Sequence, residues 1–198
     1  VAPLAVSVIE DIVEEDPAFA AGLLAEMSAD DATDLLQLAP DDVVRVLLHH
    51  MSGDARVVIE PLLAFDRRSA GGLMDPEVLK VAGDLTVREA IDIVRTTQAS
   101  VDAQYLFVVD RSGILVGVLD LRRLVIAGAE DRVIDICERQ VAAITPDIDQ
   151  EEVAREFEKY EFRVLPVVDE DRHLLGVVTV DDVLTSIREE DTEDAQKM

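Results

Sequence analysis

The segment Leu106-Phe-Val-Val-Asp-Arg-Ser-Gly-Ile-Leu-Val-Gly-Val-Leu119 is followed, 59 residues later, by the segment Leu165-Pro-Val-Val-Asp-Glu-Asp-Arg-His-Leu-Leu-Gly-Val-Val178. Each segment places a polar turn between two apolar runs rich in Val and Leu, a pattern that predicts a β-hairpin. The two segments therefore form an internal repeat. At the constant offset of 59, the first segment is matched at Val108, Val109, Asp110, Leu115, Gly117 and Val118.

An amphipathic helix is predicted upstream of each hairpin, at Val87 to Thr97 in the first copy and at Gln150 to Tyr160 in the second. Each unit thus alternates helix and strand, which indicates a mixed α/β fold from about Leu73 onward. Glu89 and Glu152 align at an offset of 63, and 63 − 59 = 4. We therefore expect a four-residue insertion in the first copy, around residues 100–103.

Residues 1–65 carry a helical pattern only. Helix starts are predicted at Ser28, Pro40 and Ser52, which are twelve residues apart, with Ser28 as a capping residue. Two further helices are predicted at 4–13 and 17–27. Helices this short are stable only when they pack on their neighbours, so the pattern predicts a stack of short antiparallel helices. The pattern is already under way at residue 1, and we expect the helical array to extend upstream of it.

Composition excludes several classes of function. The 198 residues include 43 acidic and 18 basic side chains, a formal net charge of −25 that repels nucleic acid and attracts cations. An acidic surface that only maintains solubility is the alternative that composition leaves open. No apolar run reaches the length of a membrane span, so we expect this piece to be soluble. A single cysteine, three scattered histidines and no nucleophile motif or phosphate-binding loop give no reason to expect an enzyme.

The duplicated unit, with its V-V-D turn and G-V strand, resembles the CBS domain, and two copies in tandem resemble a Bateman module. Three further segments extend the resemblance to the cytosolic region of MgtE-type magnesium channels: Ser69-Ala-Gly-Gly-Leu-Met-Asp-Pro76, Thr179-Val-Asp-Asp-Val-Leu184 and Thr192-Glu-Asp194. It implies an α + α/β fold, in which a superhelical N-terminal domain of short helices (1–68) precedes CBS domain 1 (69–128) and CBS domain 2 (129–186). An acidic connecting, or plug, helix then begins at 187–198.

The resemblance also implies a function and partners. The region is expected to be a homodimer on the cytoplasmic side of a membrane, joined beyond Met198 to the transmembrane pore domain of the same polypeptide. Mg²⁺ is expected to bridge acidic residues of different domains and to favour a compact, pore-closed state. Mg²⁺ suits this role because it binds through one or two carboxylates and keeps several waters. The alternative, from a different class, is a stand-alone CBS pair that senses adenine nucleotides and regulates another partner. A purely structural dimerisation module is a third hypothesis.

Carried over residue by residue, the resemblance gives a set of candidate metal ligands. Asp30 is expected to face Asp182 across an ion, although an acid near a helix N-terminus is also favoured by the helix dipole alone. Glu151 and Glu161 are expected to meet acids of the connecting helix, or else to form a solvated helix face. On the connecting helix, the spacing of three and four residues places Glu190, Glu193 and Asp194 on one face.

The resemblance implies a nucleotide site as well, with ATP as the expected ligand. Tyr105, Arg122 and Phe162 stand at the matching positions, and Thr179 belongs to the Ser/Thr pattern of the second copy. The first copy departs from that pattern, since Arg123 stands where an acid usually contacts ribose. Tyr105 and Phe162 are equally consistent with core aromatic residues.

Overall fold

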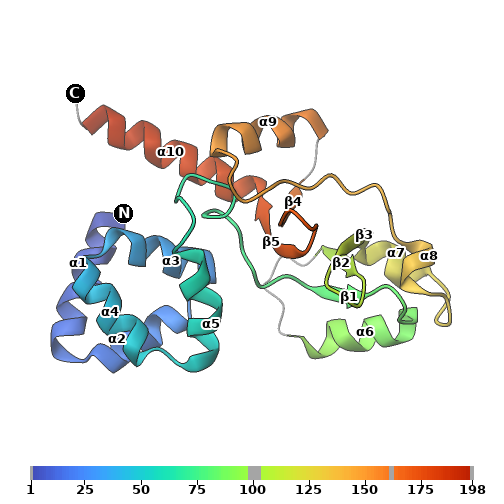
Figure 1. The fold of residues 1–198 in the computed structure, drawn as a ribbon, viewed down its shortest axis with the longest axis horizontal. Helices are drawn as coiled ribbons and strands as arrows, with labels where there is room; N and C mark the ends of the chain where they lie inside the picture. The colour runs from blue at the N-terminus through green and yellow to red at the C-terminus, as the bar shows by residue number, and fades with distance from the viewer. Residues whose placement is uncertain (1, 98–103, 161–162, 197–198) are drawn as a thin grey trace.

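The computed structural model describes residues 2–97, 104–160 and 163–196, and Figure 1 shows their arrangement. Five helices form the N-terminal part, which we call the helical domain: α1 (Ala2–Glu15), α2 (Pro17–Ala25), α3 (Ala29–Leu38), α4 (Asp41–His50) and α5 (Gly53–Leu62). The predicted stack of short helices is confirmed.

The three predicted helix starts are also confirmed, because Ser28, Pro40 and Ser52 are the N-cap residues of α3, α4 and α5. Their chemistry differs. The Ser52 hydroxyl accepts a hydrogen bond from the Ala55 amide, whereas the Ser28 side chain makes no capping hydrogen bond with any described residue. The expectation of a side-chain cap at Ser28 was therefore wrong. The first turn of α3 instead carries Asp30 and Asp31, whose charges oppose the positive end of the helix dipole.

The rest of the chain consists of two repeats. The first repeat contains β1 (Lys80–Ala82), α6 (Val87–Thr96), β2 (Tyr105–Val109), β3 (Leu115–Asp120), α7 (Leu121–Ile126) and α8 (Val133–Ile136). The second repeat contains α9 (Gln150–Tyr160), β4 (Val164–Val168), β5 (Leu174–Thr179) and α10 (Val180–Gln196). The insertion expected at residues 100–103 lies outside the described residues.

The hairpins of the two repeats have the same register. Val108 pairs with Gly117 between the antiparallel strands β2 and β3, and Val167 pairs with Gly176 between β4 and β5. Both pairs are related by the offset of 59, which confirms the internal repeat. In the first repeat, β1 adds a parallel strand beside β2. The fold class expected from the sequence, a helical domain followed by a pair of mixed α/β repeats, is thus observed.

The two repeats contact each other through their hairpin turns. The Leu115 amide donates to the Arg172 carbonyl at 2.9 Å, and the Leu174 amide donates to the Gly113 carbonyl at 3.2 Å. Below the turns, an apolar cluster contributed by both repeats closes the contact. Its buried members are Phe107, Leu115, Val168, Leu174 and Val177.

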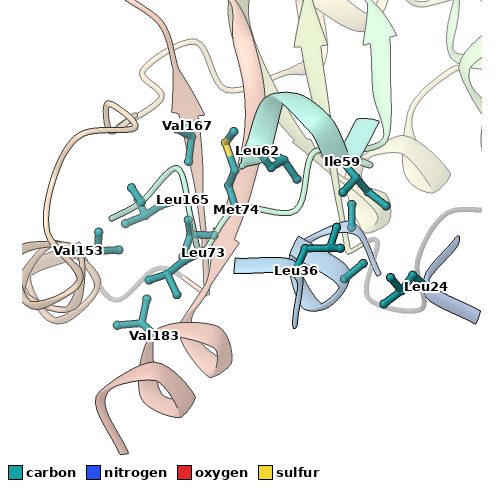
Figure 2. Packing of buried hydrophobic residues seen from close by; sticks show 14 of the residues in the cluster. Leu24, Leu36, Ile59, Leu62, Leu73, Met74, Val153, Leu165, Val167 and Val183 are labelled. Carbon is teal, nitrogen blue, oxygen red and sulfur yellow. The ribbon is translucent and has the colours of Figure 1, made fainter. Parts of the chain in front are cut away.

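A second apolar cluster joins the helical domain to the second repeat. It runs from Leu24 and Leu36 of the helical domain, through Leu73 and Met74 of the connecting segment, to Val183 of α10. Figure 2 shows the connecting residues in this cluster. Burial of apolar side chains stabilises a contact by roughly 25 cal/mol per Å². The helical domain is therefore held against the second repeat by a shared core, and this contact positions the acidic site described below.

Candidate functional site

An acidic cavity lies where the helical domain meets the second repeat. Its volume is about 200 Å³. Helix α3 contributes three acids to it, and the first turns of α10 contribute a fourth acid from the opposite side. Asp30, Asp31, Asp34, Gly72, Leu73, Asp182, Thr185 and Ser186 line the cavity.

Asp30 has an unsatisfied carboxylate in this contact. It lies in the first turn of α3, and its Oδ1 atom is buried without a hydrogen-bond partner among the described residues. A buried polar atom that lacks a partner typically costs about 1–3 kcal/mol, and more when it is charged. The contact between the helical domain and the second repeat therefore leaves this oxygen without a hydrogen-bond donor among the described residues.

Asp182 approaches the cavity from α10, in a position fixed by the start of that helix. Its Oδ2 accepts hydrogen bonds from the Thr179 hydroxyl at 2.5 Å and the Thr179 amide at 3.1 Å, and its own amide donates to the Thr179 hydroxyl at 3.3 Å. These reciprocal bonds form a capping box. Within the described residues, no hydrogen bond reaches the second oxygen, Oδ1. Burial raises the pKa of Asp182 above its ordinary value, and the charges of Asp30 and Asp181 raise it further.

Asp75 lies close enough to Asp30 and Asp182 for their charges to interact with its own. Its backbone pairs with Val177 of β5, with the Asp75 amide 2.8 Å from the Val177 carbonyl. Its Oδ1 accepts from the Glu77 amide at 2.8 Å. Burial is the largest cause that raises the pKa of Asp75, and the charges of Asp30, Glu77 and Asp182 add to it. Asp30, Asp75 and Asp182 thus come from three separate segments and repel one another.

This arrangement fits a hydrated cation better than a closed metal cage. Oxygen ligands of high charge density and one orphaned carboxylate oxygen suit a hard cation such as Mg²⁺, which usually keeps several of its waters. In the described parts of the chain, no three His, Cys, Asp or Glu side chains are grouped closely enough to hold a metal directly. A cation between these acids would therefore reach some of them through water.

A second cavity, of about 500 Å³, lies on the first repeat. It is lined by side chains of β2, β3 and α7 together with one residue of the segment that follows α8. The Arg123 guanidinium lies 3.9 Å from the Glu138 carboxylate, and both side chains are more than half exposed. Tyr105, Val118, Asp120, Arg122, Arg123, Ile126 and Glu138 form the lining.

The two cavities occupy equivalent places in the two repeats. At the offset of 59, Arg123 and Ile126 of the second cavity correspond to Asp182 and Thr185 of the acidic one. The strand residues agree as well, since Val118 bridges to Glu138 as Val177 bridges to Asp75. One cleft is therefore covered by the helical domain, and the other is open and carries two arginines.

Comparisons with known proteins place this fold. A family model described as the MgtE intracellular N domain matches residues 4–68, and a CBS domain model matches residues 70–130 and 133–189. A magnesium transporter MgtE of Thermus thermophilus is 41% identical over 177 residues, which cover 86% of this chain and 39% of that protein. The chain belongs to the MgtE family.

Two solved structures resemble this MgtE-family chain over nearly its whole length. One is the cytosolic domain of the Mg²⁺ channel MgtE in complex with ATP, at 36% identity and a TM-score of 0.85, covering 94% of this chain and 75% of that one. The other is the soluble part of a magnesium transporter, at 34% identity and a TM-score of 0.85, covering 92% and 72%. The chain spans less than half of the Thermus relative. None of its described helices has the length and hydropathy of a membrane span.

The structure of this MgtE-family chain brings only some of the predicted site residues together. Asp30 and Asp182 line one cavity, whereas Glu151 lies on α9, where its exposed carboxylate pairs with Arg155 at 3.1 Å. Tyr105 and Arg122 share the second cavity, but Thr179 does not line it and instead caps α10. Glu161 and Phe162 lie outside the described residues. Glu190, Glu193 and Asp194 lie on α10, but their side chains are not described.

Sequence analysis missed Asp75. The residue stands in the Met-Asp-Pro segment ahead of the first repeat, about a hundred residues from Asp182. Only the long-range backbone bridge to Val177 brings it to the second repeat. The internal repeat indicates the position of Asp75 only once the structure is known. Glu138 bridges to Val118 in the open cleft as Asp75 bridges to Val177 in the acidic one.

Proposed function

We propose that this chain is the cytosolic, Mg²⁺-sensing part of a magnesium transporter. In the proposed mechanism, Mg²⁺ enters the acidic cavity, neutralises the repulsion between the helical domain and α10, and favours the compact arrangement. When the cation leaves, the uncompensated carboxylates push α3 away from α10. The change would reach a pore, carried by the rest of the polypeptide, through α10 on the cytoplasmic side of the membrane.

The observation that carries the proposal is the buried, unpartnered Oδ1 of Asp30 beside Asp182. A contact between the two domains alone gains nothing from burying this oxygen, since no residue that the structure describes donates a hydrogen bond to it. A divalent ion with its water shell supplies both the missing positive charge and the missing donors. The magnesium-transporter relatives support the choice of Mg²⁺ as the cation.

Calorimetric titration with MgCl₂ tests this proposal. Asp30→Asn is expected to weaken Mg²⁺ binding by about fivefold or more. Asp42→Asn is the matched control, because Asp42 lies in the first turn of α4 and is exposed to solvent. The control is expected to bind as the wild type does. Equal Mg²⁺ affinity in the two variants, or no saturable heat with the wild type, would reject the cavity as the sensor.

We further propose that the whole protein is a homodimer, with contacts between CBS pairs. Exposed apolar side chains on the first repeat support this idea, since Val125 and Ile126 of α7 are each 74% exposed. Leu184, which corresponds to Val125 at the offset of 59, is 44% exposed on α10. Sedimentation of the chain tests the proposal: a dimer is expected, and Val125→Glu is expected to shift it to the monomer.

Nucleotide binding is a second candidate function, favoured by the open cavity of the first repeat. Tyr105 offers a ring for a base, and Arg122 and Arg123 offer positive charge for phosphates. The ATP complex of the MgtE relative supports ATP as the ligand. Titration with ATP is expected to give about one site per chain, and Arg122→Ala is expected to weaken it. Binding that is unchanged in Arg122→Ala would reject this cavity.

A further inference from the structure

One face of α3 meets two opposite kinds of partner. Asp30, Asp34 and Gln37 are spaced four and three residues apart, so they share this face. At the N-terminal end of the face, Asp30 meets the like charges of Asp75 and Asp182. At the other end, Asp34 accepts a hydrogen bond from Arg67 at 3.1 Å, and the Gln37 side chain donates to the Phe65 carbonyl at 2.9 Å. One end of α3 is therefore repelled by its surroundings and the other is attached to them.

The segment that carries Arg67 is fastened to the second repeat. The Ala70 amide donates to the Ile148 carbonyl and the Gly71 amide to the Pro146 carbonyl, each at 2.8 Å. The Gln150 amide, at the start of α9, donates to the Arg68 carbonyl at 2.8 Å. Through these main-chain bonds the backbone next to Arg67 moves with the second repeat, although it lies next to the helical domain in sequence.

The Arg67–Asp34 pair is also partly removed from solvent. The two side chains are 26% and 36% exposed, whereas the Arg56–Glu60 pair on the surface of α5 is 45% and 49% exposed. Partial burial makes the loss of one partner more costly, because the charge that remains is poorly solvated. Arg67 is thus a permanent positive charge at the edge of the acidic cavity, since Asp34 also lines that cavity.

We propose that Arg67 is a positioning residue for the cation site, and that its contact with Asp34 is the pivot about which α3 turns when the cation leaves. The pivot keeps Asp30 close to Asp182 in the cation-free state. A cation that binds again therefore has only a short distance between α3 and α10 to close. A tethered pair of this kind has a high effective concentration, which lowers the cation concentration needed for closure. The idea that a cation closes the gap rests on the proposed function, whereas the pivot itself does not.

The test compares the radius of gyration of the wild type and four variants by X-ray scattering, first with a chelator and then along a MgCl₂ titration. Arg67→Gln removes the pivot, Arg67→Lys retains its charge, and Asp34→Asn removes its partner. Arg56→Gln is the matched control, because it deletes the same charge from an ion pair that lies within one helix. Far-UV circular dichroism monitors the folding of every variant.

With the chelator, Arg67→Gln and Asp34→Asn are both expected to be more expanded than the wild type. The result for Asp34→Asn is diagnostic, because simple relief of charge repulsion would make that variant more compact. In the titration, the Mg²⁺ midpoint of Arg67→Gln is expected to rise roughly threefold to tenfold, with an unchanged radius at saturation. Arg67→Lys should recover most of this shift, and Arg56→Gln should superimpose on the wild type.

If Arg67→Gln and Arg56→Gln have the same radius of gyration in the chelator and the same Mg²⁺ midpoint, the proposed pivot is rejected. The same holds if Asp34→Asn is more compact than the wild type in the chelator. If Mg²⁺ does not change the radius of gyration of the wild type, the proposed function is rejected. The measurements with the chelator still decide whether Arg67 is a pivot.

Discussion

Asp182 and Arg123 occupy the same place in the two repeats, 59 residues apart, so one cleft carries an acid where the other carries a base. In the second repeat the acid completes a capping box with Thr179. In the first repeat the N-cap residue of α7 is Asp120, which accepts from the Arg122 amide at 2.5 Å, and Arg123 is left to face Glu138. The acidic cleft is thus lined by four acids and no base, whereas the open cleft is lined by two acids and two arginines, and only the open cleft offers positive charge to an anion.

The anionic ligand of the open cleft is expected to be held by its phosphates. Arg123→Gln should weaken ATP binding by about threefold to tenfold and should reduce its dependence on salt, because a charge-assisted contact is lost. Adenosine without phosphates should bind the wild type and the variant equally. Isothermal titration at two salt concentrations measures both effects. An equal loss for adenosine and ATP would instead assign Arg123 to the shape of the cavity.

The two capping boxes allow stability to be separated from sensing. Thr86 forms the same box with Glu89 at the start of α6, far from the acidic cavity. Thr179→Val and Thr86→Val should each destabilise the fold by about 1 kcal/mol in thermal unfolding. Only Thr179→Val should also raise the Mg²⁺ midpoint, because Thr179 holds Asp182 in place. A similar shift of the midpoint in both variants would mean that it follows stability alone.

Acid is expected to imitate the cation. Asp75 and Asp182 have raised pKa values in the folded chain, mainly through burial. The folded chain therefore binds protons more tightly than the unfolded chain does. Above their raised pKa values both acids are ionised and the destabilisation is fully present; it is relieved as the pH falls through those values. In the presence of a chelator, lowering the pH from neutrality should compact the wild type.

Scattering measured along a pH series checks this prediction. The double variant Asp75→Asn/Asp182→Asn carries no titrating group at these two positions and should compact much less as the pH falls. Parallel pH profiles for the wild type and the double variant would show that general neutralisation of the acidic surface causes the effect.

The segment that joins the helical domain to the second repeat depends on a glycine. A Cβ atom at Gly72 would lie 2.2 Å from the Asp66 carbonyl oxygen and 2.8 Å from the Arg67 Cα atom, both of which are backbone atoms. Gly72→Ala should therefore destabilise the chain by about 1–3 kcal/mol in denaturant unfolding. Gly53→Ala is the control, since nothing lies within 4 Å of its Cβ position. Comparable losses in the two variants would contradict the tight backbone contact.

Much of the fold follows from local patterns in the sequence. The starts of α3, α4 and α5 are readable because Ser28, Pro40 and Ser52 interrupt apolar runs at a regular spacing. The hairpins are readable because the repeat preserves the V-V-D turn and the glycine that faces it across the strands. Such signals depend on neighbouring residues, and the internal repeat presents the hairpin signals twice.

The acidic site was predictable only in part. The pairing of Asp30 with Asp182 came from the family resemblance, because no local pattern relates two residues on different domains. Asp75 and Arg67 were not foreseen, since the first reaches the cavity through a main-chain bridge to Val177 and the second contacts Asp34, 33 residues away. Composition indicated an excess of acids but could not tell a carboxylate with a buried oxygen, such as that of Asp30, from the many exposed ones.

The most direct test of the central claim is small-angle X-ray scattering of the wild type and of Asp30→Asn, with MgCl₂ or with NaCl of equal ionic strength. We predict a saturable decrease in the radius of gyration of the wild type that MgCl₂ produces and NaCl does not. We predict that Asp30→Asn needs several times more Mg²⁺ to reach the same radius. Scattering curves of the wild type that superimpose in the two salts would contradict the account.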